Sequence, residues 1–179
     1  MTYSGDRILL SSQREGQVSR FRGWVLVVVP LAAILFQVYV PLFFQVLRFL
    51  ELPLLVVIYF AIMRRSQISG LMIGALIGLA QDSLSGPKNP LGMFGIDKTL
   101  VGYFAASVGM RFDVEHGFIR LLLCFLFYVF HQFFYWVLAR ALLSKPLTLD
   151  LPNTALLGLL NAVVGITLFA FLDRLRDRG

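Results

Sequence analysis

The stretch that decides the fold class is Gly23 to Leu47, GWVLVVVPLAAILFQVYVPLFFQVL, which contains no charged residue. A helix needs about 20 apolar residues to cross the hydrocarbon core of a bilayer, and this run is long enough. Across all 179 residues, 58% are hydrophobic and 15% are charged, with a mean hydropathy of +0.79. Soluble domains carry about 25% charged residues, so this composition indicates an integral membrane protein.

Five further runs without charged residues follow along the chain. The runs 121–139 and 151–172 are long enough to cross a membrane, whereas the other three need residues from their flanks. We therefore predict an all-α integral membrane fold, a bundle of six transmembrane helices over residues 23–172, between basic tails at 1–22 and 173–179. The expected spans are 23–44, 47–63, 67–84, 92–110, 118–143 and 152–172.

The basic residues flank the apolar runs and form no patch, which argues against nucleic-acid binding although the net charge is +6. Loops rich in Lys and Arg stay in the cytoplasm during insertion, so alternate segments can be compared. Eleven basic residues fall on one set of segments, namely Arg7, Arg14, Arg20, Arg22, Arg64, Arg65, Arg111, Arg120, Arg174, Arg176 and Arg178. Four fall on the other set, namely Arg48, Lys88, Arg140 and Lys145. We expect both termini in the cytoplasm.

Small residues form stripes on three of the expected helices. Gly70, Gly74 and Gly78 recur every four residues, so they lie on one face and let another backbone approach closely. That face packs either against a neighbouring span or against a partner subunit, and the first alternative is our main expectation. The remaining packing or partner-binding candidates are Gly95, Gly102, Ala106 and Gly109 on the fourth span, and Gly158, Ala162 and Gly165 on the sixth.

Ionisable residues inside membrane spans are costly to desolvate and are therefore candidates for function. Asp82, Asp97 and Lys98 fall near the outer interface of the expected spans. We expect these residues to clamp helices together in preference to a catalytic role, and an ion pair between Asp82 and Lys98 is feasible. Asp97 and Lys98 are adjacent and point about 100° apart on a helix, so they should face different partners.

Polar residues also interrupt the fifth and sixth spans. His131 and Gln132 lie in a run of aromatic residues, and Asn161 lies in the last span. A metal site needs several ligands. The only other histidine, His116, falls in a loop, and the single Cys124 lies in an apolar run, so we expect no metal and no cofactor. Bonding between helices is the main expectation, and an aromatic pocket that stacks a vitamin is the alternative.

Two carboxylates on one side of the membrane also suggest an aspartyl hydrolase of the lipoprotein signal peptidase kind. That chemistry requires Asp82 and Asp97 to share a water and a proton. The polar residues that flank the aspartates of that family are missing here, and no other catalytic motif is found. We expect no catalytic residues.

The middle of the chain, about residues 50–110, resembles the rod shape-determining protein MreD family. The resemblance rests on Leu52-Pro53 through Ala61, Arg64-Arg65, the glycine stripe ending in Gln81-Asp82, and Gly102-Tyr103. One departure is Leu52, where we would expect a proline followed by an acidic residue; Glu51 lies just before it instead. The resemblance implies a fold similar to the substrate-binding subunits of energy-coupling-factor vitamin transporters.

The resemblance further implies a bacterial inner-membrane protein of the cell-elongation machinery. Its expected direct partner is an MreC-like bitopic membrane protein. Through that protein it would reach a class B penicillin-binding transpeptidase, the RodA glycosyltransferase and the MreB filament. We therefore expect a non-enzymatic scaffold for peptidoglycan synthesis and rod cell shape, in contact with membrane lipid. The alternative is the substrate-binding subunit of a vitamin transporter.

Overall fold

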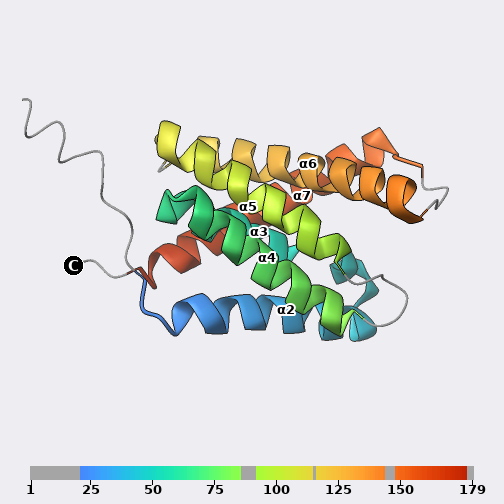
Figure 1. Ribbon diagram of the computed structural model, residues 1–179, viewed down its shortest axis with the longest axis horizontal. Coiled ribbons are helices and arrows are strands. Elements are labelled where there is room, and N and C mark those ends of the chain that lie inside the picture. The colour runs from blue at the N-terminus through green and yellow to red at the C-terminus, as the bar shows by residue number, and fades with distance from the viewer. Residues whose placement is uncertain (1–20, 86–91, 115, 144–147, 177–179) are drawn as a thin grey trace, which may run out of the picture.

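The computed structural model describes residues 21–85, 92–114, 116–143 and 148–176, and over these residues the chain is a bundle of helices (Figure 1). Six α-helices and one short 3₁₀-helix are found there. In chain order they are α2 (Val25–Phe43), η1 (Gln45–Phe49), α3 (Leu52–Arg64), α4 (Gln67–Leu84), α5 (Met93–Arg111), α6 (Gly117–Leu143) and α7 (Leu151–Asp173).

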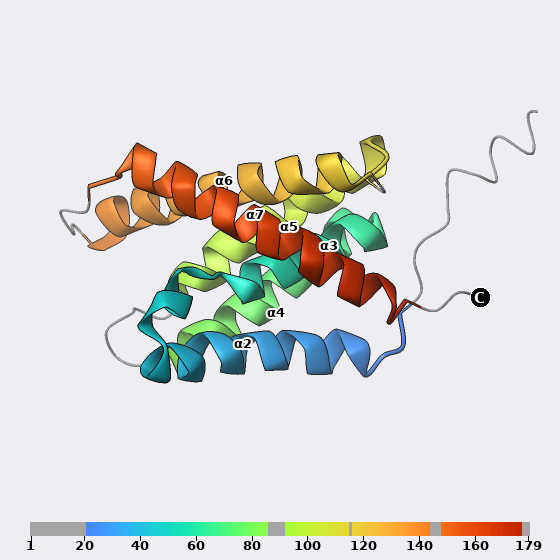
Figure 2. The same cartoon turned by 180° about the vertical axis from the view of Figure 1, so that it is seen from behind.

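Helix α3 is the centre of the bundle. All of its residues from Pro53 to Met63 are buried, and the other five α-helices each contact it. Figure 2 shows α7 crossing over α3, with α2 and α6 on opposite sides. A helix that is apolar all round belongs in a core. With 13 residues, α3 is shorter than the roughly 20 that span a bilayer, which is consistent with its enclosed position.

The expected second span, 47–63, lies within the apolar segment Gln45–Arg64 and contains parts of two helices. Residues 45–49 form the separate helix η1, and α3 begins only at Leu52 with Pro53 in its first turn. Proline has no backbone N–H to donate to the preceding turn, and it disfavours helical backbone at the residue before it. Pro53 therefore suits the first turn of α3, where no backbone donor is needed.

Four segments are long and apolar enough to cross a membrane among the described residues. They are α2, Gln45–Arg64, α6 and α7. Helices α4 and α5 are lower in apolar content because they carry glycines and buried polar residues, and they pack against each other. Large apolar side chains such as Leu31, Leu76 and Leu159 point outwards and are exposed, as expected of a surface that faces lipid.

The chain ends that the structure describes meet at one end of the bundle, where Phe21 forms a backbone bridge with Arg176 (Figure 1). We call this the basic end, and the opposite end, with η1 and the beginning of α5, the distal end. The basic end carries Arg22, Arg64, Arg65, Arg111, Arg120, Arg174 and Arg176. Its cytoplasmic placement stays a prediction from the charge bias. Lys88, Lys145, residues 1–20 and residues 177–179 lie outside the described residues.

A polar cluster fastens three helices at the basic end. The Tyr59 hydroxyl on α3 donates to Asp173 Oδ1 at the end of α7, over 2.9 Å. Arg120 on α6 pairs with the other oxygen of Asp173 at 2.5 Å and also donates to the carbonyl of Val114 at 2.9 Å. Because each polar group here has a partner, the cluster fixes where α3, α6 and α7 meet.

Candidate functional site

The glycine stripe of α4 lies directly against α5. A Cβ atom added to Gly70 would overlap the carbonyl oxygen of Gly102, and one added to Gly78 would overlap that of Phe94. At Gly74, in the middle of the stripe, an added Cβ would overlap the carbonyl oxygen of Lys98. Backbone therefore meets backbone along the whole of this interface, which is the packing that small residues permit in membranes.

The other small residues also point inwards. Gly102 and Ala106 face Gly70, whereas an added Cβ at Gly109 would approach Ile62 of α3. On α7, Gly158 lies against Phe125 and Tyr128 of α6, Gly165 lies against Cys124, and Ala162 is fully buried. Gly95 lies against Leu79 and Asp82 of α4. These faces are therefore occupied by contacts within the chain.

Asp82 holds the first turn of α5. Its carboxylate accepts hydrogen bonds from the backbone N–H groups of Gly92 at 3.0 Å, Phe94 at 3.2 Å and Gly95 at 2.9 Å. Helix N-termini have N–H groups without partners and a partial positive charge, and a carboxylate satisfies both. The sequence left open an ion pair between Asp82 and Lys98; among the described residues Asp82 is a cap instead, and Lys98 has another partner.

Lys98 pairs with a residue that the sequence analysis did not select. Its Nζ atom lies 3.8 Å from Oε2 of Glu51, which directly precedes α3, and 4.5 Å from the centre of the Phe94 ring. The Lys98 side chain is fully buried and that of Glu51 is 14% exposed. A buried ammonium group needs a counter-ion, and Glu51 supplies it. In the sequence, the feature that could have indicated this pair is Glu51, the acidic residue directly before the Leu52-Pro53 helix start.

Asp97 faces a different neighbour and pairs with His131 of α6. Both side chains are almost completely buried, at 0% and 2% exposure. Neighbouring residues on α5 thus reach different helices, with Asp97 towards α6 and Lys98 towards α3, as expected from their angular separation. Together these two pairs attach the first turns of α5 to both neighbours.

Asn161 and Gln132 complete the set of polar residues. The Asn161 side chain accepts from the backbone N–H of Glu51 at 2.8 Å and donates to the carbonyl of Phe49 at 2.8 Å, so α7 holds the break between η1 and α3. It also donates to Leu157 of its own helix. Gln132 donates to the hydroxyl of Tyr128 at 3.1 Å, one turn away on α6.

This arrangement can hold helices together, and it gives the two aspartates different partners. Asp82 is engaged by three backbone N–H groups and Asp97 by His131, so they share no partner of the kind an aspartyl dyad requires. Among the described residues, no group of three or more His, Cys, Asp or Glu side chains could hold a metal ion. We call Glu51, Asp82, Asp97, Lys98, His131 and Asn161 the polar clamp.

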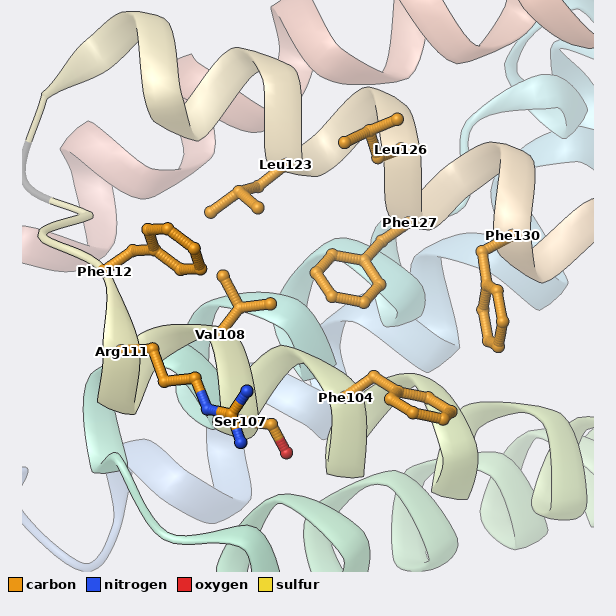
Figure 3. Close-up of a pocket in the computed structure, with 9 residues that line it drawn as sticks. All are labelled: Phe104, Ser107, Val108, Arg111, Phe112, Leu123, Leu126, Phe127 and Phe130. Carbon is orange, nitrogen blue, oxygen red and sulfur yellow. The ribbon is translucent and has the colours of Figure 1, made fainter.

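A cavity of about 480 Å³ lies between α5 and α6, towards the basic end (Figure 3). No feature of the sequence analysis pointed to it. Its walls are Phe104, Val108 and Phe112 on the α5 side and Leu123, Leu126, Phe127 and Phe130 on the α6 side. Ser107 and Arg111, one turn apart on α5, are its polar lining residues.

Comparison with known proteins gives one result. The model of the rod shape-determining protein MreD family matches residues 19–175. The chain belongs to the MreD family. The matched range includes all six helices and every residue of the polar clamp. No curated protein and no solved structure matches the chain.

Membership gives this membrane protein a role in rod shape determination and places it in the MreBCD shape system. It also agrees with the all-helical, apolar bundle found in the structure. Proteins of the MreD family are, in general, shape-determination proteins without enzymatic activity.

Proposed function

We propose that this MreD-family chain is a non-enzymatic scaffold subunit of the bacterial cell-elongation (Rod) complex, and that it binds the single transmembrane helix of an MreC-like bitopic protein. The observation that carries the proposal is the family match, because it extends over the whole bundle. Through the MreC-like protein the scaffold reaches the class B penicillin-binding transpeptidase and RodA outside, and the MreB filament inside.

The proposal places the chain in the bacterial inner membrane with both termini in the cytoplasm. Support comes from the gathering of seven described arginines at the basic end, where both described chain ends lie. Such a bias sets orientation during insertion and attracts anionic lipid headgroups afterwards. On this proposal the basic end faces the MreB filament and the distal end faces the cell-wall enzymes.

The polar clamp supports a scaffold because its members connect helices to one another. Asp97 joins α5 to α6, Lys98 joins α5 to α3, and Asn161 joins α7 to the start of α3. A bundle held in this way presents fixed outer faces. The glycine faces are already used inside, so a partner helix would pack on exposed apolar side chains, of which α2, α4 and α7 offer many.

Purification of the full chain from native membranes in mild detergent tests the proposal. We expect a bitopic protein with a coiled-coil segment to be retained. A small photoreactive leucine analogue placed at the exposed Leu35 of α2, Leu76 of α4 or Leu160 of α7 should cross-link that protein from at least one face. The matched control is Leu172 of α7, which is 1% exposed and should give no cross-link to another protein.

Two other outcomes would count against the scaffold proposal. Absence of a bitopic protein from the purified material, together with no cross-link from any of the three faces, would contradict the scaffold. Recovery of a pair of ATPases with a retained vitamin would favour the transporter alternative and its fold similarity. Glu51 pairs with Lys98, and Asp97 with His131, at the distal end, and the α5–α6 cavity is mainly apolar, which favours the scaffold over the vitamin transporter.

A further inference from the structure

The cavity between α5 and α6 has the features of a ligand site. Its volume of about 480 Å³ falls within the range of roughly 300–1,000 Å³ that is common for small-molecule sites. Phe104 and Leu126, on opposite walls, are about half exposed, so the cavity opens sideways towards the surrounding lipid. We call it the α5–α6 groove.

The length of the groove matches one leaflet of a bilayer. Along α5 its lining runs from Phe104 to Phe112, a separation of eight residues, which is about 12 Å at 1.5 Å per residue. The hydrocarbon core of a bilayer is about 30 Å thick, so one leaflet is about 15 Å. Near the middle of the bundle the Phe104 and Phe130 rings meet edge to face at 5.5 Å, and beyond them Asp97 joins His131.

These dimensions favour a lipid chain over a protein helix. A transmembrane helix is about 10–12 Å wide and about 30 Å long, and it associates through small residues that let the backbones approach. The groove is too short for such a helix, and its walls are mainly bulky side chains, with Ser107 the one small lining residue. An acyl chain is thin and flexible, and it is only as long as one leaflet.

A positively charged side chain at the groove can bind the polar part of a ligand. Arg111 ends α5 at the basic end, is exposed, and forms no ion pair within the described part of the chain. The Ser107 hydroxyl lies one turn earlier on the same wall (Figure 3). A guanidinium group binds phosphate oxygens through two parallel N–H donors. Its position at the interface is where a phosphate headgroup lies when the acyl chains point into the membrane.

We propose that the α5–α6 groove binds one anionic phospholipid of the leaflet at the basic end, with an acyl chain among Phe104, Phe127 and Phe130 and the phosphate on Arg111. The inference goes beyond the scaffold function and does not depend on it, since the site is complete within this chain. A bound lipid fills the space that the aromatic side chains leave between α5 and α6.

Native mass spectrometry of the purified full chain, titrated with dioleoyl phosphatidylglycerol, tests the proposal. Two further probes divide the ligand into its parts: diolein has the chains without phosphate, and glycerol 3-phosphate has the phosphate without chains. We expect the wild type to retain one phosphatidylglycerol molecule. Glycerol 3-phosphate at equal concentration should not displace it, because the chain supplies most of the binding energy.

Two variants with matched controls locate the site. Arg111→Gln should weaken phosphatidylglycerol binding about tenfold and leave diolein binding unchanged, whereas Arg64→Gln at the same end should change neither. Leu126→Trp fills the groove and should weaken both lipids, whereas Leu122→Trp, on an exposed residue of the same helix outside the groove lining, should have no effect. Thermal unfolding of each variant verifies that it is folded.

Three outcomes would overturn the proposal. Equal phosphatidylglycerol binding by all four variants would show that the lipid binds elsewhere. Displacement by glycerol 3-phosphate would show a site for free anions. Loss of a co-purifying bitopic protein from Leu126→Trp, with lipid binding unchanged, would show that the groove receives a protein helix, and it would do so without contradicting the scaffold function.

Discussion

The two sides of α5 pack in different ways. Towards α4, Gly102 and Ala106 meet the glycine stripe and the backbones touch. Towards α6, in the half near the basic end, Phe104 and Val108 line a cavity of about 480 Å³ together with Phe127 and Phe130. The difference shows that the size of the residue at the interface decides how closely membrane helices approach, because lipid gives no hydrophobic drive to close a gap.

The largest loss of stability should come from disrupting the closely packed interface between α4 and α5. Gly74→Leu puts a side chain where the carbonyl oxygen of Lys98 lies, and backbone cannot move aside as a flexible side chain can. We expect the free energy of unfolding to fall by about 3 kcal/mol or more. Thermal unfolding in detergent measures it.

The control for this variant is Gly23→Leu, since no atom lies within 4 Å of an added Cβ at that glycine. It should unfold within about 0.5 kcal/mol of the wild type. Equal stability of Gly74→Leu and Gly23→Leu would show that the α4–α5 interface can open without cost.

A smaller loss is expected from removing the buried cation that joins α5 to α3. Lys98→Met leaves the Glu51 carboxylate without its counter-ion, and the free energy of unfolding should fall by about 2–3 kcal/mol. Glu51 is 14% exposed, so water can compensate part of the loss. Chemical denaturation of Lys98→Met, Glu51→Gln and the double variant measures the coupling.

The double variant decides whether the pair acts as a unit. We expect it to be more stable than Lys98→Met alone, because a neutral amide replaces an isolated carboxylate. Simple addition of the two single effects would mean that Lys98 and Glu51 do not stabilise each other.

Removing the cap of α5 should have a moderate effect. Asp82→Ala takes the acceptor from three backbone N–H groups, which should lower the free energy of unfolding by about 2 kcal/mol. The matched control is Ser83→Ala, whose hydroxyl donates only to Leu79 of its own helix. Hydrogen exchange at the Gly95 amide should rise in Asp82→Ala alone. Unchanged exchange there would argue against the cap.

The smallest effect should come from the open side of α5. Leu126→Trp adds bulk to a half-exposed residue that lines the groove, where free volume already exists. We expect its free energy of unfolding to stay within about 0.5 kcal/mol of the wild type in the same assay. A loss as large as that of Gly74→Leu would mean that α5 packs equally tightly on both sides.

The sequence predicted the helical membrane fold well because long apolar runs and regular glycine spacing are local properties. The expected span 67–84 has the same bounds as α4, and Gly70, Gly74 and Gly78 share one face in both descriptions. The pair Leu52-Pro53 marks the start of α3, although the expected span 47–63 also takes in part of η1 because apolar residues continue through it. Proline is tolerated in the first turn of a helix, where its missing N–H has no partner to lose.

The pairing of polar residues could not be predicted from spacing alone. Each residue turns a helix face by about 100°, so an error of one or two residues at a helix boundary redirects a side chain to another neighbour. Asp82 and Lys98 were close enough in sequence to suggest a pair, yet Lys98 reaches Glu51, which is 47 residues away in the chain. The groove depends on how far apart two helices lie, and the local sequence does not record that distance.

Phe21 and Arg176, the two ends of the described part of the chain, meet, so that this part forms a nearly closed loop. A short linker between them would allow new ends to be opened between α6 and α7, giving a circular permutant of the same bundle. In such a permutant, a fluorescent or enzymatic reporter fused to either new end would lie across the bilayer from a reporter fused to a natural end. A comparison of the two kinds of fusion would therefore report which side of the membrane each end of the bundle occupies, without altering any contact inside the bundle.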